Sequence, residues 1–196
     1  MSEMKSAFER AMERAESLGR ASEEDRMKWK HAPEGEKLAV KYLKDECDLV
    51  TEIGRYDEEV RQYLVEGAQG VLVRAIDLPR NEVAKKMNKK AMEAIKELKR
   101  DKVSVENVYT KLRRIFNHYE QEGAQQRKQA YEAVKQNVEA QMQQAVQQQL
   151  GPFAKMKLNV ENQPQFQQEW RRALVQLESQ YIKLLDEFKQ EILSVP

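Results

Sequence analysis

Apolar side chains recur at steps of three and four residues along most of the chain. This spacing is the periodicity of an α-helix with one buried face. Between the periodic stretches lie residues that favour helix starts, and we expect Ser22, Asp57 and Ser104 to cap the helices that follow them. The predicted helices cover residues 2–18, 23–32, 38–53, 58–76, 82–100, 105–150 and 164–193.

The prolines are predicted to mark the ends of helices, because a proline inside a helix costs about 3 kcal/mol or more. The internal prolines are Pro33, Pro79, Pro152 and Pro164. Gly67 and Gly70, by contrast, fall inside a predicted helix. Glycine is unfavourable there, so we expect both residues to let another helix approach closely.

The apolar stripe over residues 105–150 keeps its phase through Gly123, which predicts one helix about 70 Å long. Gly151 and Pro152 end this helix, and the helix over 164–193 is expected to return antiparallel along it. The facing pairs predicted for this hairpin are Leu150 with Phe166, Val138 with Leu177, and Tyr131 with Leu184.

Together these elements predict an all-α fold, a bundle of about six to seven helices that ends in a long antiparallel helical hairpin. We expect residues 1–118 to form the helical body. Residues 119–196 are expected to form a hairpin arm continuous with it, made of a Gln-rich helix and a returning amphipathic helix.

The returning helix carries more bulky apolar side chains than one facing helix can cover. Surplus apolar surface of this kind is typical of an interface. We therefore predict that the protein self-associates or binds a protein partner through this helix. The candidate interface residues are Phe166, Trp170, Leu174, Leu177, Tyr181, Leu184 and Phe188.

Composition agrees with few, long helices, since apolar residues make up 40% of the chain and only 7 glycines and 5 prolines are available for turns. The net charge is +1, which predicts no general attraction to nucleic acid or membranes. The charge is uneven, however. Residues 1–66 hold 17 acidic and 12 basic side chains, and residues 82–118 hold 11 basic and 5 acidic ones, so the middle of the chain is basic.

Cys47 is the single cysteine of the chain and lies within an apolar stripe, so we expect a buried structural thiol in a reducing compartment. The first residues lack the apolar core of a signal peptide, and we find no apolar stretch long enough to span a membrane. These features predict a cytoplasmic protein.

The sequence offers no recognisable catalytic chemistry. His31 and His118 are the two histidines, and neither belongs to a metal-binding spacing. The glycines at positions 67 and 70 lie inside a helix, which excludes a phosphate-binding loop between strand and helix. We therefore predict no enzyme activity, cofactor, metal or small-molecule ligand.

The main alternative is nucleic-acid binding by the basic helix over residues 83–100. Its candidate basic face consists of Lys85, Lys86, Lys89, Lys90, Lys96 and Arg100. The same lysines are also typical of the solvated side of a bundle helix. A second alternative is a chaperone-like holdase, in which the hairpin arm binds unfolded proteins.

Overall fold

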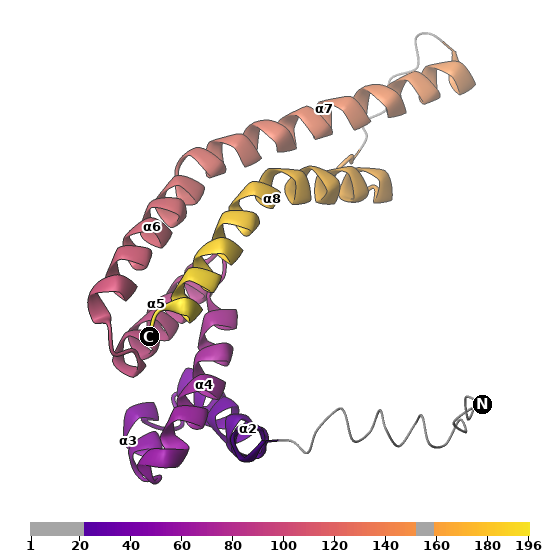
Figure 1. Cartoon of the computed structure of the whole chain (residues 1–196). Coiled ribbons are helices and arrows are strands. Elements are labelled where there is room, and N and C mark those ends of the chain that lie inside the picture. The colour runs from indigo at the N-terminus through magenta and orange to yellow at the C-terminus, as the bar shows by residue number, and fades with distance from the viewer. Residues whose placement is uncertain (1–21, 152–158) are drawn as a thin grey trace, which may run out of the picture. The chain divides into compact units, whose positions relative to one another are not determined.

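The computed structural model describes residues 22–151 and 159–196, and within these residues it contains helices and loops but no strand (Figure 1). The predicted all-α fold is confirmed. The predicted helix over residues 2–18 lies outside the described residues. The helices are α2 (Glu23–Leu43), α3 (Leu49–Gly54), α4 (Glu58–Ala75), α5 (Glu82–Leu98), α6 (Lys102–Glu120), α7 (Glu122–Leu150) and α8 (Pro164–Ser194).

The chain forms two compact units that meet within α4, one up to Leu72 and one from Val73 onward. This division differs from the predicted boundary between residues 118 and 119. The reason is that α6, which the sequence places in the body, packs on both α7 and α8 and so belongs to the same unit as the hairpin.

Helix α2 begins as predicted, because Ser22 and Asp25 form a reciprocal capping box at its start. The predicted end before Pro33 is wrong, since α2 continues for ten residues beyond this proline. Pro33 is exposed to solvent, so water can reach the backbone on its side of the helix. Packing on the opposite side stabilises the uninterrupted helix.

That packing depends on two glycines where α2 and α4 cross. A Cβ atom on Gly35 would lie 2.0 Å from the Leu64 carbonyl oxygen, and one on Gly67 would lie 2.0 Å from the Ala32 carbonyl oxygen. The backbones are therefore in direct contact, as predicted for Gly67. The same prediction is wrong for Gly70, where a Cβ would meet no atom within 4 Å.

The predicted helix over residues 38–53 is divided into α2 and α3. Asp45 has a positive φ of 64°, which ends α2, and the Asp48 carboxylate then accepts a hydrogen bond from Thr51 N at 2.8 Å to start α3. Cys47 lies in this connection with its Sγ 3.6 Å from the Leu38 carbonyl oxygen. Cys47 is half-buried, so the predicted burial is only partly reached, and desolvation raises the pKa of its thiol.

In the second unit, α5 starts at the predicted place, with Asn81 as its N-cap. Helix α6 starts at Lys102, three residues before its predicted first residue, so the predicted N-cap Ser104 is wrong. Its N-cap is Asp101, whose carboxylate accepts hydrogen bonds from both the backbone N and the hydroxyl of Ser104. Ser104 therefore contributes to the cap as a donor. A short acidic side chain at the start of a helix also interacts favourably with the helix dipole.

The predicted helix over residues 105–150 is interrupted at one residue, Gln121, where α6 ends and α7 begins. Figure 1 shows α7 continuing in nearly the direction of α6, with a bend at the junction. Gly123 lies directly after the junction and is buried. A Cβ at Gly123 would lie 3.1 Å from the Tyr181 hydroxyl, so a small residue is needed for α8 to approach here.

The antiparallel hairpin forms, but its register differs from the predicted one. Val138 packs with Phe166 instead of Leu177, and Tyr131 contacts the rings of Phe166 and Trp170 instead of Leu184. Helix α8 is thus displaced toward α6, and the last turns of α7 extend beyond its start (Figure 1). The connection over residues 151–163 is longer than a tight turn, and its residue Val160 packs into the hairpin core.

Candidate interaction surface on the C-terminal helix

The inner face of α8 is held against α7 by an aromatic and aliphatic cluster. Phe166 is 1% exposed and packs with Val138 and Val160. The Tyr131 ring meets the rings of both Phe166 and Trp170 edge-on, each at 5.2 Å between centroids. This geometry is favourable for aromatic pairs beyond the area that they bury.

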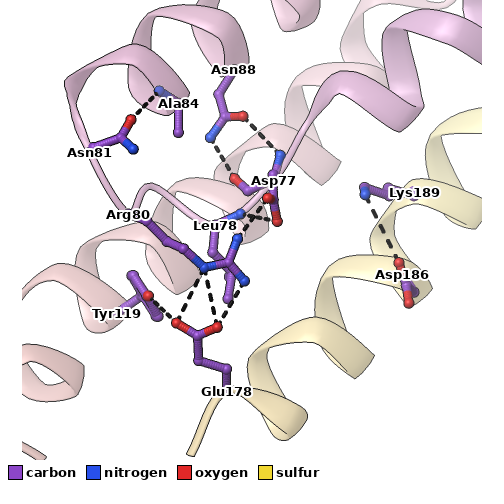
Figure 2. A network of polar contacts seen from close by, with 10 residues as sticks. All are labelled: Asp77, Leu78, Arg80, Asn81, Ala84, Asn88, Tyr119, Glu178, Asp186 and Lys189. Atoms are coloured by element: carbon purple, nitrogen blue, oxygen red, sulfur yellow. Dashed lines mark hydrogen bonds and ion pairs between the residues drawn. The ribbon is translucent and has the colours of Figure 1, made fainter. Parts of the chain in front are cut away.

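The loop between α4 and α5 brings a charged side chain to the middle of α8, as Figure 2 shows. The buried Asn88 amide fixes the loop by accepting a hydrogen bond from Asp77 N at 2.9 Å and donating one to Asp77 O at 2.6 Å. The Asp77 carboxylate in turn accepts hydrogen bonds from Leu78 N and from Arg80 Nη1, each at 2.7 Å. Arg80 is thereby oriented toward α8.

Arg80, Tyr119 and Glu178 join this loop, α6 and α8 in one polar network (Figure 2). Arg80 donates to Glu178 from Nε at 3.2 Å and from Nη2 at 2.8 Å, and the Tyr119 hydroxyl donates to the same carboxylate. Burial alone would raise the pKa of Glu178, but these hydrogen bonds outweigh it and hold the pKa below its ordinary value. Burial and the nearby carboxylate raise the pKa of Tyr119 to about 12.

A second layer of contacts surrounds Tyr119. The Arg127 guanidinium lies 4.0 Å from the centroid of the Tyr119 ring, and Tyr181 meets that ring edge-on at 5.2 Å. The Tyr181 hydroxyl and His118 Nδ1 are hydrogen-bonded at 2.8 Å. These contacts join α6, α7 and α8 around Gly123 and fix which side of α8 faces inward.

The far end of α8 is held by Lys99, which follows α5 and is 6% exposed. Its ammonium group donates to the carbonyl oxygens of Val195 and Leu193. Carbonyl groups at the end of a helix lack partners within the helix, and a cation stabilises the negative end of its dipole. Burial lowers the pKa of Lys99. A lysine of the basic segment therefore caps α8.

Replacing Lys99 by methionine should lower the free energy of unfolding by about 1–2 kcal/mol, because the α8 carbonyls lose a charged donor while the side-chain volume is nearly kept. Urea denaturation followed by circular dichroism measures this loss. The matched control is Lys102→Met, at an exposed lysine whose pair with Glu97 is also exposed. The control should change stability by less than about 0.5 kcal/mol. Equal stability of the two variants would contradict the capping role of Lys99.

The structure distributes the seven predicted interface residues over three environments. Phe166 is in the core of the hairpin and is not available to a partner. Leu184 is exposed. The half-buried residues are Trp170, Leu174, Leu177, Tyr181 and Phe188. Leu177, Tyr181 and Leu184 line one groove with Ile115 and His118 of α6. The prediction of a surplus apolar face is therefore wrong for Phe166, because Val138 of α7 and Val160 of the connection together enclose its ring.

An exposed apolar flank of α8 was not predicted from the sequence. Val175 is 70% exposed and Ile182 is 39% exposed, and both line a shallow depression formed by α8 alone. They lie seven residues apart, a spacing that keeps two side chains on one side of a helix. The sequence does contain one signal for this arrangement. Glu178 is a carboxylate among the apolar positions of the helix, which indicates that part of its inner face makes polar contacts within the protein.

Five of the six residues of the predicted basic face lie on α5 and Arg100 follows its end, and several of the lysines lie near carboxylates. Lys85 pairs with Glu82 and Glu120, Lys96 pairs with Glu106 at 2.8 Å, and Lys89 lies 3.9 Å from Glu93. Lys86 and Arg100 are exposed and Lys90 is half-buried. Hydrogen bonds to Glu120 and Glu82 raise the pKa of Lys85. Nucleic-acid binding stays an untested prediction, with three of its six cations already near carboxylates.

Within residues 22–151 and 159–196, the structure contains no cluster of three or more histidine, cysteine or acidic side chains suited to a metal ion. None of the described helices has a stretch that is long and apolar enough to cross a membrane. A further groove between α5 and α6 has an apolar floor that includes Met92, Tyr109 and Phe116, and its rim carries charges of both signs.

One protein family matches most of the chain. No curated protein and no solved structure matches it. Residues 50–194 match a family that is described as a family of unknown function (DUF6657). The match begins in α3 and includes α4 to α8 in full, so it contains the Arg80–Tyr119–Glu178 network and the exposed flank of α8 with Val175 and Ile182. The chain belongs to the DUF6657 family.

Proposed function

We propose that this protein is a non-catalytic interaction protein that binds a protein surface through the outer side of α8. The observation that carries the proposal is the exposure of Val175 and Ile182 on a helix that the Arg80–Glu178 contact holds in place. Two branched apolar side chains one heptad apart form a stripe suited to contact with another helix. The second unit has a polar cluster between its helices, in which Arg80 and Tyr119 both donate hydrogen bonds to Glu178. Because these groups bind one another, they support a structural role.

We also propose that this binding takes place in the cytoplasm. The chain contains one cysteine, so it cannot form an internal disulfide, and the pKa of the Cys47 thiol is raised by burial. The lack of an internal disulfide suits a protein that works in a reducing compartment, and the raised pKa lowers the reactivity of the thiol.

The test is the double substitution Val175→Asp/Ile182→Asp in the full chain. Size-exclusion chromatography with light scattering reports self-association, and affinity capture reports other protein partners. We expect binding to fall by at least about tenfold, because burying each apolar side chain contributes about 1.5–3 kcal/mol. Both positions are exposed, so the helical circular dichroism signal and the unfolding midpoint should not change.

The matched control is Val83→Asp, which places the same charge on an exposed valine of α5 and should leave binding unchanged. Trp170 and Tyr181 are unsuitable for this test, since both contact aromatic rings inside the hairpin. If the wild-type chain and the Val175→Asp/Ile182→Asp variant have the same oligomeric mass by light scattering and capture the same proteins, the proposed function is wrong.

A further inference from the structure

The outer side of α8 carries a row of exposed residues that we name the outer stripe. It consists of Gln168, Arg171, Val175, Ser179, Ile182 and Asp186, and each of them is exposed. Their spacings of three and four residues keep them on one side of the helix. Glu178 lies three residues after Val175 and four before Ile182, so the stripe runs beside the Glu178 network, on a flank of α8 that stays exposed.

The order of charges along the outer stripe is the second observation. Arg171 lies four residues before Val175, and Asp186 lies four residues after Ile182. Within the stripe, the segment from Arg171 to Asp186 therefore has its apolar and charged residues at equal distances from a centre between Glu178 and Ser179, with opposite charges at its two ends. The Asp186 carboxylate lies 4.0 Å from Lys189 Nζ within the helix, a long contact that leaves it able to meet another cation (Figure 2).

From this pattern we infer that the occupant of the outer stripe is the α8 helix of a second copy of this chain, running antiparallel. The inference rests on the proposed function and names its partner. A twofold axis between Glu178 and Ser179 places Val175 against Ile182 of the second copy, and Arg171 against its Asp186. Such an interface is isologous, so both contacts occur twice. The apolar pair lies at the centre and the charge pairs lie at its ends, as in stable interfaces.

A parallel pairing of the same helices does not satisfy these charges. It would place Arg171 against Arg171 and Asp186 against Asp186, and juxtaposed like charges weaken association. The antiparallel arrangement converts both repulsions into attractions and still places an apolar residue against an apolar residue, Val175 against Ile182. Charge complementarity thus selects the orientation as well as the partner.

The first experiment exchanges the charges. In sedimentation equilibrium of the full chain, Arg171→Glu and Asp186→Arg should each weaken self-association by at least about tenfold, because symmetry places each substitution in the interface twice. An equimolar mixture of the two variants should associate as the wild type does, since the new carboxylate at position 171 of one chain then meets the new guanidinium at position 186 of the other. The double variant Arg171→Glu/Asp186→Arg should also recover. High salt should reduce the defect of each single variant.

The second experiment locates the twofold axis by disulfide cross-linking in a Cys47→Ser background. Ser179→Cys should form a covalent dimer rapidly on oxidation, because the axis brings the two copies of residue 179 into contact. Gln168→Cys is the matched control on the same stripe. The axis separates its two copies by about 21 residue positions, which is about 30 Å along the helix and far beyond disulfide reach. A parallel pairing would cross-link both variants.

Three results would overturn the inference. If the wild-type chain remains monomeric at all concentrations, a second copy is excluded as the occupant. The proposed function nevertheless stands if the wild type captures a different protein and the Val175→Asp/Ile182→Asp variant does not. If the wild type self-associates but the mixture of Arg171→Glu and Asp186→Arg does not, the proposed register is excluded. Cross-linking of Gln168→Cys as fast as Ser179→Cys excludes the antiparallel orientation.

Discussion

Replacing Gly67 by alanine should lower the stability of the first unit by about 3 kcal/mol, at the upper end of the range for adding one methyl group to a packed interior. The added Cβ would lie 2.0 Å from the Ala32 carbonyl oxygen and 2.8 Å from its carbonyl carbon. Both are backbone atoms, so no side-chain rotation relieves the overlap and the two helices must separate. The separation would expose Leu64 and Ala68, which are fully buried.

The matched control is Gly70→Ala in the same helix, where a Cβ meets no atom within 4 Å. It should be neutral or stabilising by up to about 1 kcal/mol, because alanine favours the helix. Hydrogen–deuterium exchange of the α2 and α4 amides measures both effects and assigns them to this unit. Equal protection of these amides in Gly67→Ala and Gly70→Ala would show that the helices do not cross at Gly67.

Replacing Glu178 by leucine should lower the free energy of unfolding by about 2–3 kcal/mol. The substitution nearly keeps the side-chain volume, so the loss reports the polar contacts. It leaves the Tyr119 hydroxyl and the Arg80 guanidinium without their acceptor, and Tyr119 is only 2% exposed. Glu187→Leu, on an exposed position of the same helix, is the control and should change stability by less than about 0.5 kcal/mol.

A double-mutant cycle separates the network from other consequences of the substitution. Arg80→Leu combined with Glu178→Leu should cost less than the sum of the two single changes, because each single change already removes their shared interaction. Urea denaturation of the four proteins gives the coupling energy. Additive losses would mean that Arg80 and Glu178 contribute independently and that the network does not hold α8.

The wild type and Glu178→Leu should also differ in their response to acid. The pKa of Glu178 is below its ordinary value in the folded protein, so the carboxylate contributes stability that is present above the unfolded pKa of about 4.3. That contribution is lost as the pH falls through the folded pKa. The stability difference between wild type and Glu178→Leu should thus be largest near neutral pH and shrink at acid pH.

Most helices could be predicted because their signals are local. Helix α8 starts at Pro164 and ends at Ser194, within one residue of the range that its apolar spacing predicts. The capping box at Ser22 and the cap at Asn81 are likewise formed by residues that lie three positions apart. Periodicity and capping depend on neighbours in the chain, so one sequence is enough to find them.

Helix interruptions were less predictable, since they depend on what a helix packs against. Pro33 usually signals an end, yet α2 continues because Gly35 lies directly on the α4 backbone. Around Gln121 the apolar stripe thins but keeps its phase, yet the helix ends for one residue, next to the contact between the Tyr119 and Tyr181 rings. In each case long-range packing outweighs a local preference of a few kcal/mol.

The amino-acid pattern alone established an all-α chain, the approximate extent of its helices and an amphipathic C-terminal helix, because backbone propensity and apolar spacing act over a few residues. The register of the hairpin, the burial of Phe166 and the partners of Glu178 were set by folding in three dimensions. Glu178 meets Arg80 and Tyr119, which precede it by 98 and 59 residues. No local pattern encodes such pairs. They decide which side of α8 turns inward, and therefore which residues, led by Val175 and Ile182, are left for a partner.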